Sequence, residues 1–340
     1  MNQQPGLSRR GFLSRAAAGG VVAGWSTQGA RAAVQPASAE NPWRYDVDQL
    51  RKVDPALIRF EPVRQFPVGH AAARRVVFGR HGRLFVAAGK SVLALGPEGQ
   101  RESAWDVGEQ VRCLRVDDAG AVWIGVKDRV LVFDANGERT ARWDAFAGKA
   151  YLTGLTVTER DVWVADSGNR VVYRCDRKGR LELRLGERSA DRKVPGLVLP
   201  SPFLDIEAGA DGLLRVNNAG RHRVEVYTRD GDLEQSWGRP GVAIDSFCGC
   251  CNPIGLALLP DGRCLTAEKG LPRVKVYSAA GEFESVVAGP ASFAAVGSAE
   301  REQTVAETAH DGLDVAVDGE GRIAVLDLVG GTLHLFRSKA

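Results

Sequence analysis

Short apolar runs separated by glycine-containing turns dominate the chain from about Leu57 onward. The runs are rich in Val, Leu, Ile and aromatic residues, and none keeps a period of 3.6 residues long enough for a helix. Tripeptides such as Pro260-Asp261-Gly262 and Arg229-Asp230-Gly231 separate the runs. They predict tight hairpin turns, because glycine readily adopts the positive φ that such turns need. The pattern therefore predicts an all-β fold.

The turn glycines recur in pairs, which marks an internal repeat. Two glycines of one unit lie 17 residues apart near the start of the chain and 19 apart further on. The pairs are Gly82 with Gly99, Gly120 with Gly137, Gly212 with Gly231, and Gly262 with Gly281. Each unit is predicted to hold four strands, and six such units span residues 56–340. Since a lone four-stranded sheet cannot bury both faces, the units are expected to stack as propeller blades.

The two ends of the repeat region are each incomplete. The last unit stops at Phe336-Arg337 without a fourth strand, whereas residues 56–66 form a strand without a unit. We therefore predict that the N-terminal strand completes the last blade. Such closure would remove an open sheet edge that otherwise invites aggregation.

The polar loop after the second strand carries a family motif. Residues 162–171 read Val-Trp-Val-Ala-Asp-Ser-Gly-Asn-Arg-Val, and third strands read Arg-Val-Glu-Val-Tyr at 223–227 and Arg-Val-Lys-Val-Tyr at 273–277. These stretches resemble NHL repeats over about residues 67–340, and the resemblance implies a six-bladed β-propeller with the first strand of each blade innermost. One polar position recurs after the second strand and is expected to make a repeated structural hydrogen bond: Asp166, Asn218, Glu268 and Asp327.

The N-terminal residues have the composition of a targeting segment. Ser8-Arg9-Arg10-Gly11-Phe12-Leu13 resembles the twin-arginine export signature and precedes an apolar stretch at 16–25 and an Ala30-Arg31-Ala32 cleavage pattern. The apolar stretch is about half as long as a membrane-spanning helix requires, so no membrane span is expected. We predict a signal peptide at 1–32, a tether at 33–55, and a periplasmic or secreted protein. The resemblance implies export in the folded state, often with a metal cofactor already inserted.

Composition narrows the class of protein and its partners. The 340 residues are 44% hydrophobic and 26% charged, which is typical of a globular chain. Residues 1–32 hold four arginines and no lysine or carboxylate, so their removal takes the formal net charge from +3 to −1. Because phosphate-backbone binding relies on a strongly positive surface, nucleic acid is not expected as a partner. We expect a monomer that meets a redox or protein partner at one propeller face.

Three clustered cysteines are the main candidate for chemistry. Cys248, Cys250 and Cys251 lie just before the fifth inner strand. One position at the start of each inner strand is expected to face the central channel: Arg75, Cys113, Gly154, Asp205, Gly255 and Asp314. Cys113 is therefore a candidate fourth ligand. Close thiolates repel one another unless a soft cation such as copper(I) or zinc, or an iron–sulfur cluster, binds them.

Other uses of the cysteines stay open. The exported chain would hold six cysteines in an oxidising compartment, so disulfides that staple the loop are one alternative, and a reactive thiol is another. Cys175 and Cys264 occupy apolar strand positions and are predicted to be core residues. His70 and His310 precede channel positions and are weaker candidates for metal ligands or acid–base groups.

Three functions follow from these features. The first is an exported metal-binding propeller with a redox, electron-transfer or accessory role. The second is a lyase or hydrolase with a metal in the channel, since NHL propellers include the peptidyl-hydroxyglycine lyase and six-bladed propellers include metal-dependent lactonases. The inner strands of this chain carry no matching set of histidines. The third is a propeller that binds a protein or small ligand, with the cysteines only stapling a loop.

Overall fold

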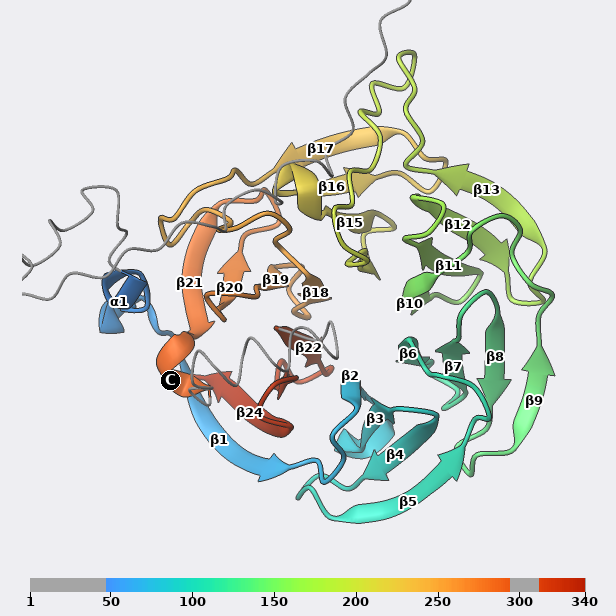
Figure 1. Ribbon diagram of the computed structural model, residues 1–340, viewed down its shortest axis with the longest axis horizontal. Coiled ribbons are helices and arrows are strands. Elements are labelled where there is room, and N and C mark those ends of the chain that lie inside the picture. The colour runs from blue at the N-terminus through green and yellow to red at the C-terminus, as the bar shows by residue number, and fades with distance from the viewer. Residues whose placement is uncertain (1–46, 294–311, 340) are drawn as a thin grey trace, which may run out of the picture. The chain divides into compact units, whose positions relative to one another are not determined.

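The chain folds into a ring of six four-stranded sheets (Figure 1). The computed structural model describes residues 47–293 and 312–339. The predicted export signal at 1–32, most of the predicted tether and His310 lie outside the described residues. Within the described ranges, α1 (Val47–Leu50) is the longest α-helix, and no helix is long and apolar enough to cross a membrane. The predicted all-β, six-bladed propeller is confirmed.

Neighbouring strands of a blade pair antiparallel, and the first strand of each blade faces the channel. Blade 1 comprises β2 (Ala73–Phe78), β3 (Leu84–Ala88), β4 (Ser91–Leu95) and β5 (Arg101–Asp106). Blade 2 comprises β6 (Cys113–Val116), β7 (Val122–Gly125), β8 (Val130–Phe133) and β9 (Arg139–Arg142). Blade 3 comprises β10 (Leu152–Val157), β11 (Asp161–Asp166), β12 (Val171–Asp176) and β13 (Leu181–Leu185).

The remaining blades follow the same order. Blade 4 comprises β14 (Ile206–Ala208), β15 (Leu214–Asn218), β16 (Arg223–Tyr227) and β17 (Leu233–Trp237). Blade 5 comprises β18 (Gly255–Leu258), β19 (Cys264–Ala267), β20 (Val274–Tyr277) and β21 (Phe283–Ala288). Blade 6 comprises β22 (Leu313–Val317), β23 (Ile323–Asp327), β24 (Thr332–Ser338) and β1 (Phe60–Pro67). Short 3-10 turns are η1 (Pro55–Leu57), η2 (Arg80–Gly82), η3 (Ala219–Arg221) and η4 (Pro290–Ser292).

The outer strand of blade 6 comes from the beginning of the propeller. Strand β1 pairs antiparallel with β24, from Phe60 opposite Ser338 to Pro67 opposite Thr332, with one register shift between Pro62 and Arg64. Phe60 is 3% exposed and packs against the apolar residues between blades 5 and 6. The first and last strands of the propeller therefore share one sheet.

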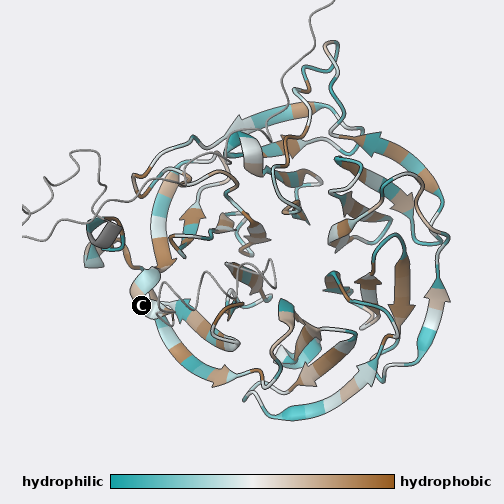
Figure 2. Cartoon of the chain, in the orientation of Figure 1, coloured by the Kyte–Doolittle hydropathy of each residue, from teal (hydrophilic) through white to brown (hydrophobic). Residues whose placement is uncertain are grey.

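Apolar side chains pack between neighbouring blades rather than in one central core. Trp163 and Ala165 of blade 3, for example, pack against Leu204 and Ile206 beside blade 4. Figure 2 shows hydrophobic residues concentrated on the inner strands and more hydrophilic residues on outer strands such as β5 and β9. Cys175 and Cys264 are buried in these clusters, as their apolar strand positions indicate.

The recurring polar position after the second strand makes structural hydrogen bonds. The Asp166 carboxylate accepts from the backbone N–H groups of Tyr151, Gly168 and Asn169. The Asp327 carboxylate accepts from Val329 and Gly330 in the equivalent loop of blade 6. In both blades the aspartate carboxylate accepts hydrogen bonds from loop N–H groups that have no partner in a neighbouring strand. These bonds hold the loop that connects the second strand to the third.

The turn glycines adopt the positive φ that the sequence predicts. The ten positions lie between +72° and +90°: Gly82, Gly99, Gly120, Gly137, Gly179, Gly212, Gly231, Gly262, Gly281 and Gly321. Two of them differ sharply in their surroundings. A Cβ at Gly281 would lie 2.1 Å from Cγ of Trp237, whereas a Cβ at Gly262 would meet no atom within 4 Å.

This difference yields a stability prediction. We expect Gly262→Ala to lower the free energy of unfolding by about 1–2 kcal/mol, because an alanine Cβ is strained at positive φ. Gly281→Ala should add about 1–3 kcal/mol for the collision with Trp237 between blades 4 and 5. Guanidinium unfolding of both variants measures the two costs. Equal destabilisation by the two substitutions would contradict the assigned packing of Trp237.

Candidate functional site

The middle of the channel is occupied by the Arg75 side chain, which extends from β2. Its guanidinium forms two hydrogen bonds with the Asp205 carboxylate, at 3.1 and 3.0 Å, and a 2.6 Å bond to Oδ1 of Asp314. A further bond of 2.5 Å reaches the Thr153 carbonyl oxygen. Arg75 therefore joins blade 1 to residues at the start of the inner strands of blades 3, 4 and 6. Asp205 and Asp314 occupy channel positions that the repeat predicts, whereas Thr153 precedes the predicted position, Gly154.

Backbone groups hold the two carboxylates in place. Oδ2 of Asp314 accepts from the Val76 N–H at 2.7 Å, and Oδ2 of Asp205 accepts from the Leu256 N–H at 3.0 Å. A Cβ at the neighbouring channel position, Gly154, would lie 3.0 Å from the Leu204 carbonyl oxygen and 3.1 Å from Asp205 Oδ1. Glycine at this position therefore lets blades 3 and 4 approach closely enough for the ionic contacts to form.

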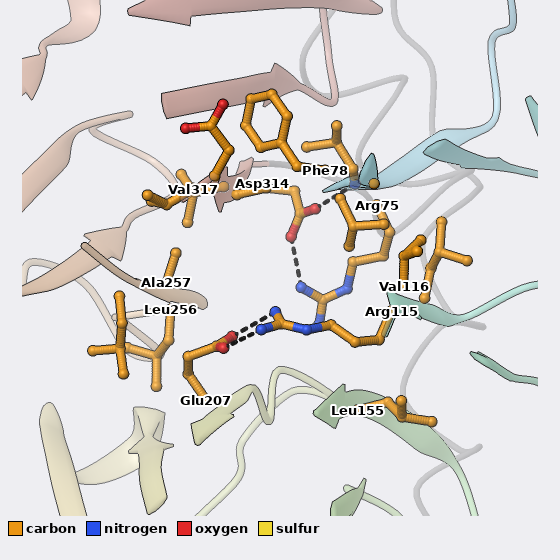
Figure 3. Close-up of a pocket in the computed structure, with 18 of the residues that line it drawn as sticks. Arg75, Phe78, Arg115, Val116, Leu155, Glu207, Leu256, Ala257, Asp314 and Val317 are labelled. Carbon is orange, nitrogen blue, oxygen red and sulfur yellow. Dashed lines mark hydrogen bonds and ion pairs between the residues drawn. The ribbon is translucent and has the colours of Figure 1, made fainter. Parts of the chain in front are cut away.

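A polar cavity of about 400 Å³ lies on the side of Arg75 where the inner strands end, here called the end face. On its wall Arg115 binds Glu207 through two hydrogen bonds of 2.9 and 2.5 Å (Figure 3). Burial raises the pKa of the Glu207 carboxyl, and Arg115 opposes that shift. Sequence reasoning missed this pair. Each residue lies two positions after a predicted channel residue. Because every second side chain of a strand points to the same face, this spacing could have predicted that both residues also face the channel.

The opposite opening, where the inner strands begin, is here called the start face. The cysteine loop, residues 246–253, leads directly into β18 on this face. Several side chains hold the loop. Asn252 donates to the carbonyl oxygens of Cys248, at 2.5 Å, and Lys269, at 3.1 Å, and accepts from the Lys269 N–H. Buried Lys275 donates to the Ser246 carbonyl oxygen at 2.8 Å. Asn252 therefore fixes the loop.

Within this loop the structure brings two thiols together. The Sγ atoms of Cys250 and Cys251 lie 3.4 Å apart; Cys250 is exposed and Cys251 is 1% exposed. Burial raises the pKa of the Cys251 thiol, but hydrogen bonds with Ser201 and Cys250, and then with Lys269, outweigh burial and lower it overall. The pKa of Cys250 is raised, because its thiol hydrogen-bonds to Cys251. The arrangement favours a thiolate at Cys251 and a thiol at Cys250.

Lys269 connects two blades. Its ammonium lies 4.7 Å from the centre of the Phe203 ring, which precedes blade 4, and interacts with Cys251, which precedes blade 5. The spacing along one chain segment does not reveal such a contact, because the contact depends on which blade comes to lie opposite.

The other predicted site residues lie in varied surroundings. Cys113 begins β6 and is 1% exposed on the channel wall, where burial raises the pKa of its thiol to about 12. His70 is exposed, and its Nδ1 accepts from the Ala72 N–H at 3.1 Å in a turn. All six cysteines are free thiols. Within 47–293 and 312–339, no three His, Cys, Asp or Glu side chains are grouped as a metal site.

Comparison with known proteins identifies the fold. No family model matches the chain, and no curated protein matches it. Among solved structures, a streptogramin B lyase is 12% identical, with a TM-score of 0.53 over 84% of this chain and 100% of that chain. The virginiamycin B lyase from Staphylococcus aureus is 11% identical, with a TM-score of 0.55 over 83% and 100%. At these identities the likeness supports the propeller fold alone.

The buried carboxyl of Asp314 gives a pH-dependent prediction. Burial raises its pKa to about 6, with Arg75 opposing and Asp205 adding to the shift. A carboxyl whose pKa is higher in the folded than in the unfolded chain stabilises the fold fully below its unfolded pKa, and this contribution is lost as the pH rises through about 6. The difference in unfolding free energy between the native chain and Asp314→Asn should therefore fall from pH 4 to pH 6 and then level off.

Chemical denaturation at several pH values measures that difference. Val63→Ala, an exposed position on β1 that removes no titratable group, serves as the control and should give a pH-independent difference. A flat profile for Asp314→Asn as well would show that Asp314 does not carry the shifted proton.

Proposed function

We propose that this protein is an exported propeller that binds a soft metal ion through Cys250 and Cys251, and acts as a redox, electron-transfer or accessory protein. The observation that supports this most is the 3.4 Å separation of the two Sγ atoms. Two thiolates on a tetrahedral zinc at about 2.3 Å would lie roughly 3.8 Å apart, so a small movement of Cys250 suffices. Export rests on the twin-arginine prediction for residues 1–32.

The charges around the pair suit a monovalent or divalent soft cation. Two thiolates at this distance repel, and a bound cation removes that repulsion. Lys269 and Ser201 stabilise the thiolate at Cys251, while exposed Cys250 gives a cation access from solvent. Cys248 in the same loop is the proposed third donor, and Cys113 the fourth. Because only two sulfurs are held close together, copper(I) or zinc is favoured over an iron–sulfur cluster, which takes four cysteines.

Metal titration tests this proposal. The full chain, purified under anaerobic conditions, is titrated with copper(I) and separately with zinc against a competing chelator. We expect one equivalent of metal, and a loss of affinity of at least about 100-fold in the Cys250→Ser/Cys251→Ser variant, because both nearby thiolates are removed. Cys248→Ser and Cys113→Ser report whether either thiol completes the site.

Cys175→Ala, a core position, is the matched control and should bind as the native chain does. An unchanged metal affinity in the double variant would overturn the proposal. Mass mapping without reductant tests the alternative in which disulfides staple the loop. A defined disulfide at Cys248, Cys250 or Cys251 would favour a binding propeller whose cysteines are structural.

A lyase acting in the channel is the second candidate. Three of the matched structures are described as lyases and cover 83–84% of this chain. The end-face cavity of about 400 Å³ contains a buried carboxyl, Glu207, against Arg115. No histidine lines this cavity among the described residues. Glu207 would then supply the acid–base group that histidines supply elsewhere.

A substrate assay distinguishes the two candidates. One matched structure is described as an inactive virginiamycin B lyase with quinupristin, so quinupristin is the first probe. Its consumption is measured by chromatography. A channel lyase is expected to consume it, to lose at least about 100-fold in rate in Glu207→Gln, and to keep its rate in the Cys250→Ser/Cys251→Ser variant. Turnover that depends on the cysteines instead would contradict catalysis in the channel.

A further inference from the structure

A second, smaller cavity of about 100 Å³ opens on the start face, on the other side of Arg75 from the end-face cavity. Its polar wall includes Arg74, the second residue of β2, Arg112, which precedes β6, and Tyr151, which precedes β10. Arg75, Thr153 and Asp314 also line it. Phe203 and Leu313 belong to its apolar wall. The cavity has several times the volume of one water in the liquid, about 30 Å³, so it suits a group of a few non-hydrogen atoms.

Arg112 has no carboxylate partner among the described residues, and Tyr151 holds it in position. One of its terminal nitrogens donates to the Tyr151 hydroxyl, and the guanidinium lies 3.9 Å from the centre of the Tyr151 ring. Its Nε is buried and has no hydrogen-bond partner, and no carboxylate of the described residues lies within ion-pair distance of it. A buried N–H donor without an acceptor is costly, so the position favours an acceptor supplied from outside the chain.

Three arginines and one carboxylate, that of Asp314, line this cavity among the described residues. Arg75 is paired with Asp205 and Asp314, and the guanidinium groups of Arg74 and Arg112 also belong to the wall. Burial lowers the pKa of Arg74; Tyr151 opposes that shift, and Arg112 and then Arg75 add to it. The Lys269 ammonium lies 4.7 Å from the centre of the Phe203 ring, which belongs to the cavity wall. Partly buried cations attract an anion more strongly than the same cations would in water, because the effective dielectric constant around them is lower.

The geometry points to a binding site for a small oxyanion, of carboxylate or sulfate size, on Arg74, Arg112 and Tyr151. A guanidinium presents its N–H groups in a fork that fits two oxygens of such an anion. The site depends on the arginines and not on the cysteines, so it stands whether or not Cys250 and Cys251 bind a metal. Lys269, over the Phe203 ring of the cavity wall, also contacts Cys251, which connects this wall to the thiol pair.

Calorimetric titration of the full chain tests the inference. Sodium sulfate and sodium acetate are titrated separately into the protein in chloride buffer at constant ionic strength, which distinguishes tetrahedral from planar anions. We expect one equivalent of at least one of the two anions to bind. Arg112→Gln should weaken that binding at least tenfold, because it removes the charge and the fork together. Arg139→Gln, an exposed position on outer strand β9, should bind as the native chain does.

Far-UV circular dichroism confirms that each variant is folded. If Arg112→Gln does not fold, Arg112→Lys keeps the charge and loses the fork, and it should weaken binding by an intermediate factor. The inference is overturned if the native chain binds neither anion above chloride, or if the folded Arg112 variant binds as tightly as the native chain. Equal weakening by Arg139→Gln would also overturn it, since the effect would then reflect overall charge.

Discussion

The contact of Arg75 with two carboxylates is the interaction on which the centre of this propeller depends. One guanidinium from blade 1 binds Asp205 and Asp314, and these carboxylates accept N–H groups from blades 5 and 1. Removing one partner of such a buried set would leave an uncompensated charge, which costs about 3–5 kcal/mol. The contact also separates the channel into an end-face cavity and a start-face cavity, so it defines both candidate sites.

Much of this architecture could be predicted from the repeat. The period of the glycine turns predicts six blades, and the start of each inner strand predicts that Arg75, Asp205 and Asp314 meet in the channel. What the repeat could not predict is which side chains pair across blades. Arg115 with Glu207, and Lys269 with Cys251, depend on the closing of the ring and on side-chain rotamers, neither of which leaves a period in the sequence. The cysteine cluster was visible, but the close approach of only two of its thiols was not.

The start face combines features that sequence reasoning treated separately. Asn217 connects them: its side chain accepts from the Asp205 N–H and donates to the Pro253 carbonyl oxygen at 2.9 Å. The cysteine loop is thus hydrogen-bonded to a residue that touches the Arg75 carboxylate partner. The cysteine loop and the central ion pair are therefore linked through one side chain, and Arg75 and Asp314 of that ion pair also line the start-face cavity.

The pairing of β1 with β24 has a consequence for biosynthesis. A ribosome releases residues 332–338 long after β1, so blade 6 cannot be completed until the strands of the other five blades have been synthesised. Until then β1 has no partner strand, and contacts between such distant segments form slowly because a long loop must close. An incomplete ring therefore exposes strand edges to other chains. Transport of a finished, closed propeller would avoid that hazard, which is what a folded-protein export signal at residues 1–32 would provide.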